Sequence, residues 1–202
     1  MAKPATRIQQ KNQTAIMDAG LEVFSKYGFR GATLDQVAEA AGLSKPNLLY
    51  YFPSKDAIYT ALLARLLENW LEPLHAMDDA GDPVEELLAY AQRKLVMSRD
   101  YPRESRLFAN EIIQGAPHIK DVLAGELRDL VTDKSAVIAR WIKAGKLRPV
   151  DPVHLIFSIW SLTQHYADFD VQVRAILGTA DPFDDAAAHI DTTFRRMLTP
   201  GP

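Results

Sequence analysis

Two short helices that meet at a glycine are the feature that most limits how this chain of 202 residues can fold. Thr33 can cap the first helix, in which apolar residues recur at the three- and four-residue spacing of an amphipathic helix. Gly42 ends it. Ser44 can cap a second helix, which carries Pro46 in its first turn, where a missing N–H is tolerated. Residues 33–56 are therefore predicted to form a helix-turn-helix.

In a helix-turn-helix the second helix lies in the major groove of DNA. The residues of this stretch that can contact phosphates or base edges are Thr33, Ser44, Lys45, Asn47, Tyr50, Tyr51 and Lys55. Thr33 can act as a cap alone or can also bind a phosphate. Lys55 lies in the first turn of the next helix, where a cation opposes the helix dipole, and a DNA phosphate would compensate it. For Tyr51, a place in the core is the better interpretation.

Charge is distributed unevenly along the chain. The net charge is −3, yet the first 60 residues carry seven Lys and Arg against five Asp and Glu. The first acidic residue is Asp18, so the extreme N-terminus is basic. Such a tail can contact phosphates or the minor groove, or it can be solvated and disordered.

The composition favours a soluble, cytoplasmic protein. Hydrophobic residues make up 48% of the chain, and no apolar run is long enough to span a bilayer. The polar, basic start is not a secretory signal. The absence of cysteine excludes disulfides and thiolate metal sites, which suits a reducing compartment.

The rest of the chain alternates helical periodicity with turn signals. Further helices are expected at about 9–27, 55–74, 83–98, 102–115, 117–145, 152–177 with fraying after Phe169, and 182–198. No alternating β-strand pattern intervenes. The sequence therefore predicts an all-α fold of about nine helices.

No enzyme, cofactor or metal site is predicted. The five histidines are scattered without metal-ligand spacing, and there is no glycine-rich phosphate loop. Ser161, His165 and Asp168 lie on one expected helix, where a catalytic triad is not formed and solvated side chains are the better interpretation.

A candidate ligand site follows from the helix expected at 152–177. Ile156, Trp160 and Gln164 form one stripe at four-residue spacing, so an amide continues an apolar face. If this stripe faces a cavity, Gln164 offers a donor beside an acceptor, which matches a planar ring carrying an N–H beside a C=O. A Trp could cover the face of such a ring. Alternatively, Gln164 is bonded to the protein itself.

Two motifs carry a resemblance to a known family. Residues 28–33 (GFRGAT) and 50–56 (YYFPSKD) closely resemble the N-terminal domain of the TetR family of one-component repressors, over about 14–67. The resemblance implies a three-helix helix-turn-helix DNA-binding domain at 1–54 and a helical ligand-binding and dimerisation domain at 55–202. It implies that Tyr50 lies on the DNA face. It also implies that the helix from residue 55 links the two domains.

Motifs within that domain and well outside it together resemble the RutR group of this family, which regulates pyrimidine utilisation. They are residues 47–55, 70–74, 98–102, 105–108, 115–117, 133–135, Trp160 and 163–169. This resemblance implies uracil or thymine as the ligand, with Trp70 and Gln164 at the positions that belong to the pyrimidine pocket. Weaker candidates, each as consistent with plain core, are Leu67, Leu71, Phe108, Ile112 and Trp160. The match fades after about Leu177, and the N-terminal tail departs from the group's longer arm.

The resemblance implies a homodimeric repressor that binds near-palindromic operator DNA. Its last two helices would pair with those of a second chain. The faces expected at that interface include Ile156, Phe157, Ile190, Phe194 and Met197. Two alternatives stay open: a TetR-type regulator with a drug-like or lipid inducer, and a helical ligand-binding protein that does not bind DNA.

Overall fold

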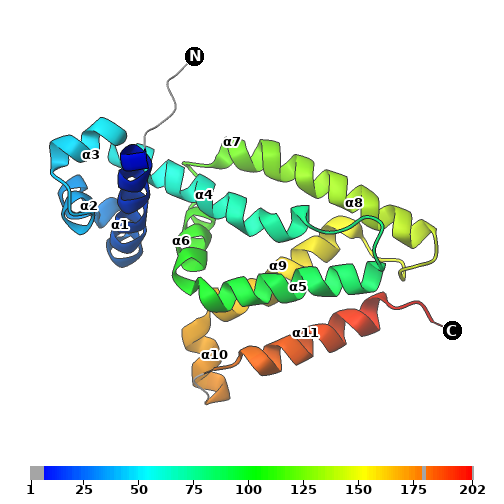
Figure 1. Ribbon diagram of the computed structural model, residues 1–202. Coiled ribbons are helices and arrows are strands. Elements are labelled where there is room, and N and C mark those ends of the chain that lie inside the picture. Colours follow the sequence, from blue (N-terminus) through cyan, green and yellow to red (C-terminus); the bar gives the residue numbers. More distant parts are fainter. Residues whose placement is uncertain (1–6, 179–180, 202) are drawn as a thin grey trace. The chain divides into compact units, whose positions relative to one another are not determined.

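The computed structural model describes residues 7–178 and 181–201 of the chain (Figure 1). Helices account for most of these residues, and no strand occurs among them. The predicted all-α fold is therefore confirmed. No helix in this part of the chain is long and apolar enough to cross a membrane.

The helices follow the predicted order, with additional breaks. They are α1 (Arg7–Gly31), α2 (Leu34–Ala40), α3 (Lys45–Tyr51), α4 (Lys55–His75), α5 (Pro83–Asp100), α6 (Pro102–Ile113), α7 (Lys120–Val122), α8 (Arg128–Lys143), α9 (Pro152–Asp168), α10 (Asp170–Leu177) and α11 (Phe183–Leu198). The helix expected at 117–145 is interrupted by a π-helical turn, Leu123–Leu127. The helix expected at 152–177 breaks at Phe169, where fraying was expected.

Local side-chain chemistry explains where the helices begin. Thr33 forms a complete capping box with Gln36: its hydroxyl accepts from the Gln36 N–H at 3.2 Å, and its own N–H donates to the Gln36 side chain at 2.9 Å. The carboxylates of Asp82 and Asp151 accept backbone N–H groups at the starts of α5 and α9. The Asp-Pro sequences at 82–83 and 151–152 therefore act as helix starts.

The chain folds into two compact units, each described here by itself. The first unit comprises the residues up to Leu67 together with Leu107–Lys120. The second unit comprises Glu68–Arg106 and the described residues from Asp121 onward. Both α4 and α6 pass from one unit to the other along the chain. The functional domains predicted at 1–54 and 55–202 stay a prediction.

In the second unit α5 packs against both α9 and α11, and Figure 1 shows α11 running beside α5. Ile156 and Ile190 are fully buried in this packing, and Phe194 is 1% exposed. The prediction that these three residues face a second chain is wrong, because they form the core of their own protomer. Phe157, which is 44% exposed, remains at the surface. Apolar periodicity identifies a buried face but not the element that covers it.

Candidate functional site

A glycine turn sets the geometry of the helix-turn-helix. Gly42 has a φ of 66°, a left-handed conformation that glycine adopts without a steric penalty. The Leu43 N–H donates to the Ala38 carbonyl at 2.9 Å, the bond that defines a Schellman ending of α2. Leu48 of α3 is fully buried and fixes this helix to the core of the first unit. The opposite side of α3 is left exposed.

The exposed side of α3 and the start of α2 carry most of the predicted DNA-contacting residues. Thr33, Ser44, Lys45 and Asn47 are exposed, and Tyr50 is 71% exposed. The hydroxyls of Thr33 and Ser44 both accept backbone N–H groups as helix caps. These five residues are therefore accessible from outside the first unit, as a contact with DNA would require.

Three contacts orient individual side chains on this surface. Lys45 forms an exposed ion pair with Asp35 at 2.9 Å, and such pairs contribute only about 0–1 kcal/mol, so a phosphate could compete for the ammonium. The Tyr50 hydroxyl accepts from Gln9 at 3.3 Å. The half-buried Tyr51 accepts from Asn12 at 2.9 Å and thereby ties α3 to α1.

Lys55 already has partners in the protein. Its ammonium donates to the carbonyls of Phe29 and Ala32 at 2.7 and 2.9 Å, and it lies 4.5 Å from the centroid of the Phe29 ring. These carbonyls lie at the end of α1, where a cation is favourable. The two carbonyls therefore stabilise the Lys55 cation at the start of α4, a role that was predicted for a DNA phosphate. An ammonium has three N–H donors, so one remains for the predicted phosphate contact.

We expect Tyr50→Phe to weaken binding to operator DNA about fivefold, because it would remove the predicted hydrogen bond to a phosphate and keep the exposed ring. Fluorescence anisotropy with the DNA upstream of the protein's own gene measures this change. Tyr27→Phe, on an exposed tyrosine of α1, is the matched control and should bind normally. Unaltered binding by Tyr50→Phe would show that this hydroxyl does not touch DNA.

The predicted effector residues divide between the two units. Leu67, Phe108 and Ile112 belong to the first unit, and Trp70, Leu71, Trp160 and Gln164 belong to the second. Leu67, Trp70 and Leu71 are buried, whereas Ile112 is 40% exposed. The four residues of the second unit lie on α4 and α9.

Gln164 is half-buried, and its amide has no hydrogen-bond partner among the described residues. It borders a hollow of about 490 Å³ together with Trp160 and Asp168, all on α9. The Trp160 indole N–H donates to the Tyr90 hydroxyl of α5 at 2.6 Å, which fixes the ring beside Gln164. Within the described part of the chain, the alternative that the protein itself satisfies Gln164 finds no support.

The three residues weighed as a catalytic triad do not form one. The Ser161 hydroxyl donates to the Phe157 carbonyl at 2.9 Å, as solvated helical serines do. Asp168 instead accepts from the Ser105 hydroxyl at 2.6 Å. Burial raises the pKa of Asp168, while the Ser105 hydrogen bond opposes that rise.

One buried polar residue beside Trp70 was not predicted from the sequence. Lys94 of α5 is 3% exposed, and its ammonium lies 3.5 Å from the Trp70 carbonyl and 5.6 Å from the centroid of the Trp70 ring. Burial lowers the pKa of Lys94 to about 7, although the charge of Asp168 opposes this shift. Tyr90, Lys94 and Ser98 recur at four-residue spacing on the buried side of α5, a polar stripe that the sequence displays.

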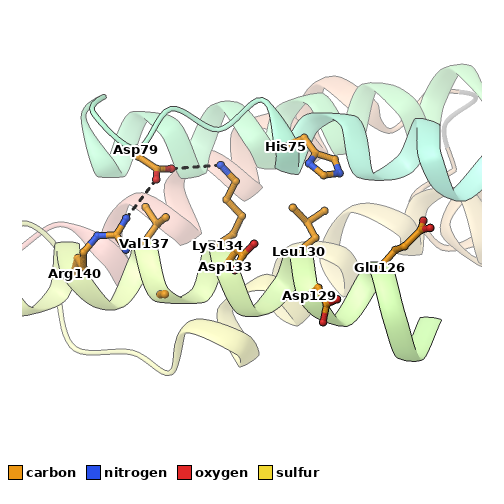
Figure 2. Close-up of a pocket in the computed structure, with 10 residues that line it drawn as sticks. His75, Asp79, Glu126, Asp129, Leu130, Asp133, Lys134, Val137 and Arg140 are labelled. Carbon is orange, nitrogen blue, oxygen red and sulfur yellow. Dashed lines mark hydrogen bonds and ion pairs between the residues drawn. The ribbon is translucent and has the colours of Figure 1, made fainter. Parts of the chain in front are cut away.

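A second hollow, of about 720 Å³, lies beside α8 (Figure 2). Figure 2 shows Asp79 paired with both Lys134 and Arg140, at 3.4 and 3.3 Å. Lys134 also donates to the Met77 carbonyl, and the Trp141 indole donates to the Asp79 carbonyl. These contacts hold the segment that follows α4 against α8. None of the predicted effector residues borders this hollow.

Comparisons with known proteins identify the family. Residues 16–62 match the family of bacterial regulatory proteins named tetR, and residues 63–201 match the C-terminal region of YcdC-like proteins within the TetR group. The two matches are adjacent and together cover most of the chain.

Individual relatives agree with these matches. The chain is 51% identical to the HTH-type transcriptional regulator RutR of Escherichia coli strain K12 over 173 residues, which are 86% of this chain and 82% of that protein. A regulatory protein of the tetR family from Rhodococcus RHA1 has the same fold, with a TM-score of 0.77, 18% identity and coverage of 98% of this chain and 100% of that one. The structure of AibR in complex with isovaleryl coenzyme A and operator DNA is also similar in fold, with a TM-score of 0.69, 17% identity and coverage of 94% and 100%. The chain therefore belongs to the TetR family of DNA-binding transcriptional regulators, and it is similar to RutR.

Proposed function

We propose that this protein is a repressor that leaves its operator when it binds a pyrimidine, uracil or thymine. The observation that carries the proposal is the amide of Gln164, which follows Trp160 on one stripe of α9 and has no partner among the described residues. A primary amide offers a donor and an acceptor side by side. These pair with the C=O and the adjacent N–H of a uracil ring.

A buried aromatic residue of α4 suits a flat ligand. Trp70 is 6% exposed, and its indole offers a broad apolar surface inside the second unit. Aromatic rings favour offset or edge contacts with other planar rings. A small ring gains little from area alone, so its polar edge must be paired for useful affinity, which is what Gln164 would provide.

The DNA-binding role we propose uses a homodimer in the cytoplasm, where the operator lies. Two copies of α3 would enter successive major grooves of a near-palindrome, with half-sites roughly 34 Å apart or more. We propose that α9 and α11 still supply the dimer contacts, through exposed side chains such as Phe157 rather than through the buried residues first expected there. This role requires no catalytic group, metal or cofactor.

A gel-shift experiment with the upstream DNA of the gene tests the proposal. We expect uracil or thymine to release the DNA, and cytosine to fail because its amino group replaces an acceptor oxygen. Release by fatty acyl compounds but not by pyrimidines would identify a lipid-responsive regulator instead. If no ligand-free shift appears with this or any genomic fragment, the protein does not act as a repressor.

A further inference from the structure

Lys94 is a buried cation with very few partners. It is 3% exposed and belongs, with Ala91 and Leu95, to the buried residues of α5. Its one hydrogen bond among the described residues, to the Trp70 carbonyl, is 3.5 Å long, at the outer limit for such a bond. None of the described carboxylates forms an ion pair with it. An ammonium has three donors, so at least two lack a close acceptor.

The packing of α5 against α9 places this ammonium beside the predicted effector residues. Tyr90 is bonded to Trp160, and the charge of Asp168 acts on Lys94. The two helices therefore run in the same direction along this contact. One turn beyond the Tyr90 and Trp160 pair, the register brings Lys94 to the level of Gln164.

We propose that Lys94 is part of the effector site and donates a hydrogen bond to an exocyclic oxygen of the bound ring, while the Gln164 amide pairs with another part of its edge. This inference rests on the proposed function and narrows the effector to rings that present an acceptor oxygen to a cation. A uracil anion, formed by loss of a ring N–H proton, also fits such a site. A ring with an amino group at that position does not.

A purely structural role explains Lys94 less well. Buried charged groups are normally paired, and each exception calls for a specific cause. The carboxyl whose charge acts on Lys94, that of Asp168, already accepts a hydrogen bond from the Ser105 hydroxyl at 2.6 Å. An effector oxygen would supply the acceptor that the protein does not, and burial would strengthen the bond. The lowered pKa of Lys94 is consistent with this unpaired state.

Calorimetry of the full-length protein with three ligands tests the inference. The ligands are uracil and the two pyrimidinones that each lack one of its exocyclic oxygens. We expect Lys94→Met to lower the affinity for uracil about 10-fold or more, because a hydrogen bond from a charged donor is lost. The substitution should lower the affinity for the pyrimidinone that keeps the oxygen bound by Lys94 by a similar factor. It should leave the affinity for the other pyrimidinone unchanged, because that ligand lacks this oxygen. Lys134→Met is the matched control, because Lys134 also donates to a backbone carbonyl but lies at the other hollow.

The outcomes separate this inference from the proposed function. If the native protein binds none of the three ligands, the proposed function fails and the role of Lys94 fails with it. If the native protein binds uracil and Lys94→Met binds it equally well, only the role of Lys94 is overturned. An equal loss of affinity for all three ligands would also overturn the role of Lys94, because such a loss would indicate a change of pocket shape. Thermal denaturation in parallel should show Lys94→Met to be at least as stable as the native chain, since a buried charge has been removed.

Discussion

The free energy of unfolding of the native chain, measured against that of Lys94→Met, rises by about 1.4 kcal/mol for each pH unit between about pH 7 and pH 10. The folded protein holds the pKa of Lys94 at about 7, whereas the unfolded chain keeps the ordinary lysine value of 10.5. Throughout this window the unfolded state therefore binds more protons, so raising the pH favours the folded state. Below pH 7 both states are protonated, and the difference between the two proteins levels off.

Urea denaturation at several pH values between 6 and 10 measures this effect. Burial raises the pKa of Asp168, the carboxyl whose charge acts on Lys94, and Asp168 is present in both the native chain and Lys94→Met. Lys134→Met serves as the control, because Lys134 is held at the edge of the second hollow beside Asp79. Its stability should follow the native pH profile. Parallel profiles for the native chain and Lys94→Met would show that Lys94 is not an unpaired buried amine.

Gln164→Leu should lower the affinity for uracil about 100-fold while changing the free energy of unfolding little. Leucine keeps the size and the apolar contact with Trp160, but it leaves the N–H and C=O of the bound ring without partners. A site built on such hydrogen bonds discriminates strongly when they are lost. Stability should hold, because the Gln164 amide has no hydrogen-bond partner among the described residues.

Calorimetry with uracil and urea denaturation of the same samples measure the two quantities separately. Gln172→Leu is the matched control, because Gln172 is exposed on α10. It should bind uracil like the native chain. Undiminished uracil binding by Gln164→Leu would remove Gln164 from the site, and a large loss of stability would assign it a structural role.

The helix-turn-helix was predictable because its determinants are local. Thr33, Ser44 and Gly42 act on backbone groups a few residues away, and the structure shows each cap and the left-handed glycine. The break of the long helix before α8 was not predictable in the same way. A π-helical turn at Leu123–Leu127 changes one turn of hydrogen bonding without disturbing the apolar pattern that suggested a continuous helix.

The sequence could not predict which helices cover each buried face. The periodicity of Ile156, Ile190 and Phe194 correctly indicated buried faces, but it did not show that α5, α9 and α11 bury them within one chain. Lys94 was missed for a related reason, since lysine is almost never fully buried and an isolated lysine in a helix is ordinarily taken as exposed. Its four-residue spacing from Tyr90 and Ser98 was the available signal.

Coupling between the effector and the operator is the claim on which the proposed function depends. If uracil releases the protein from DNA, operator DNA must weaken uracil binding by the same factor, because the two equilibria are linked. Calorimetric titration of uracil into the protein, alone and saturated with operator, measures this factor directly. We expect uracil to bind roughly 5- to 150-fold more weakly in the presence of operator. Equal affinities under the two conditions would contradict the claim that a pyrimidine controls DNA binding by this protein.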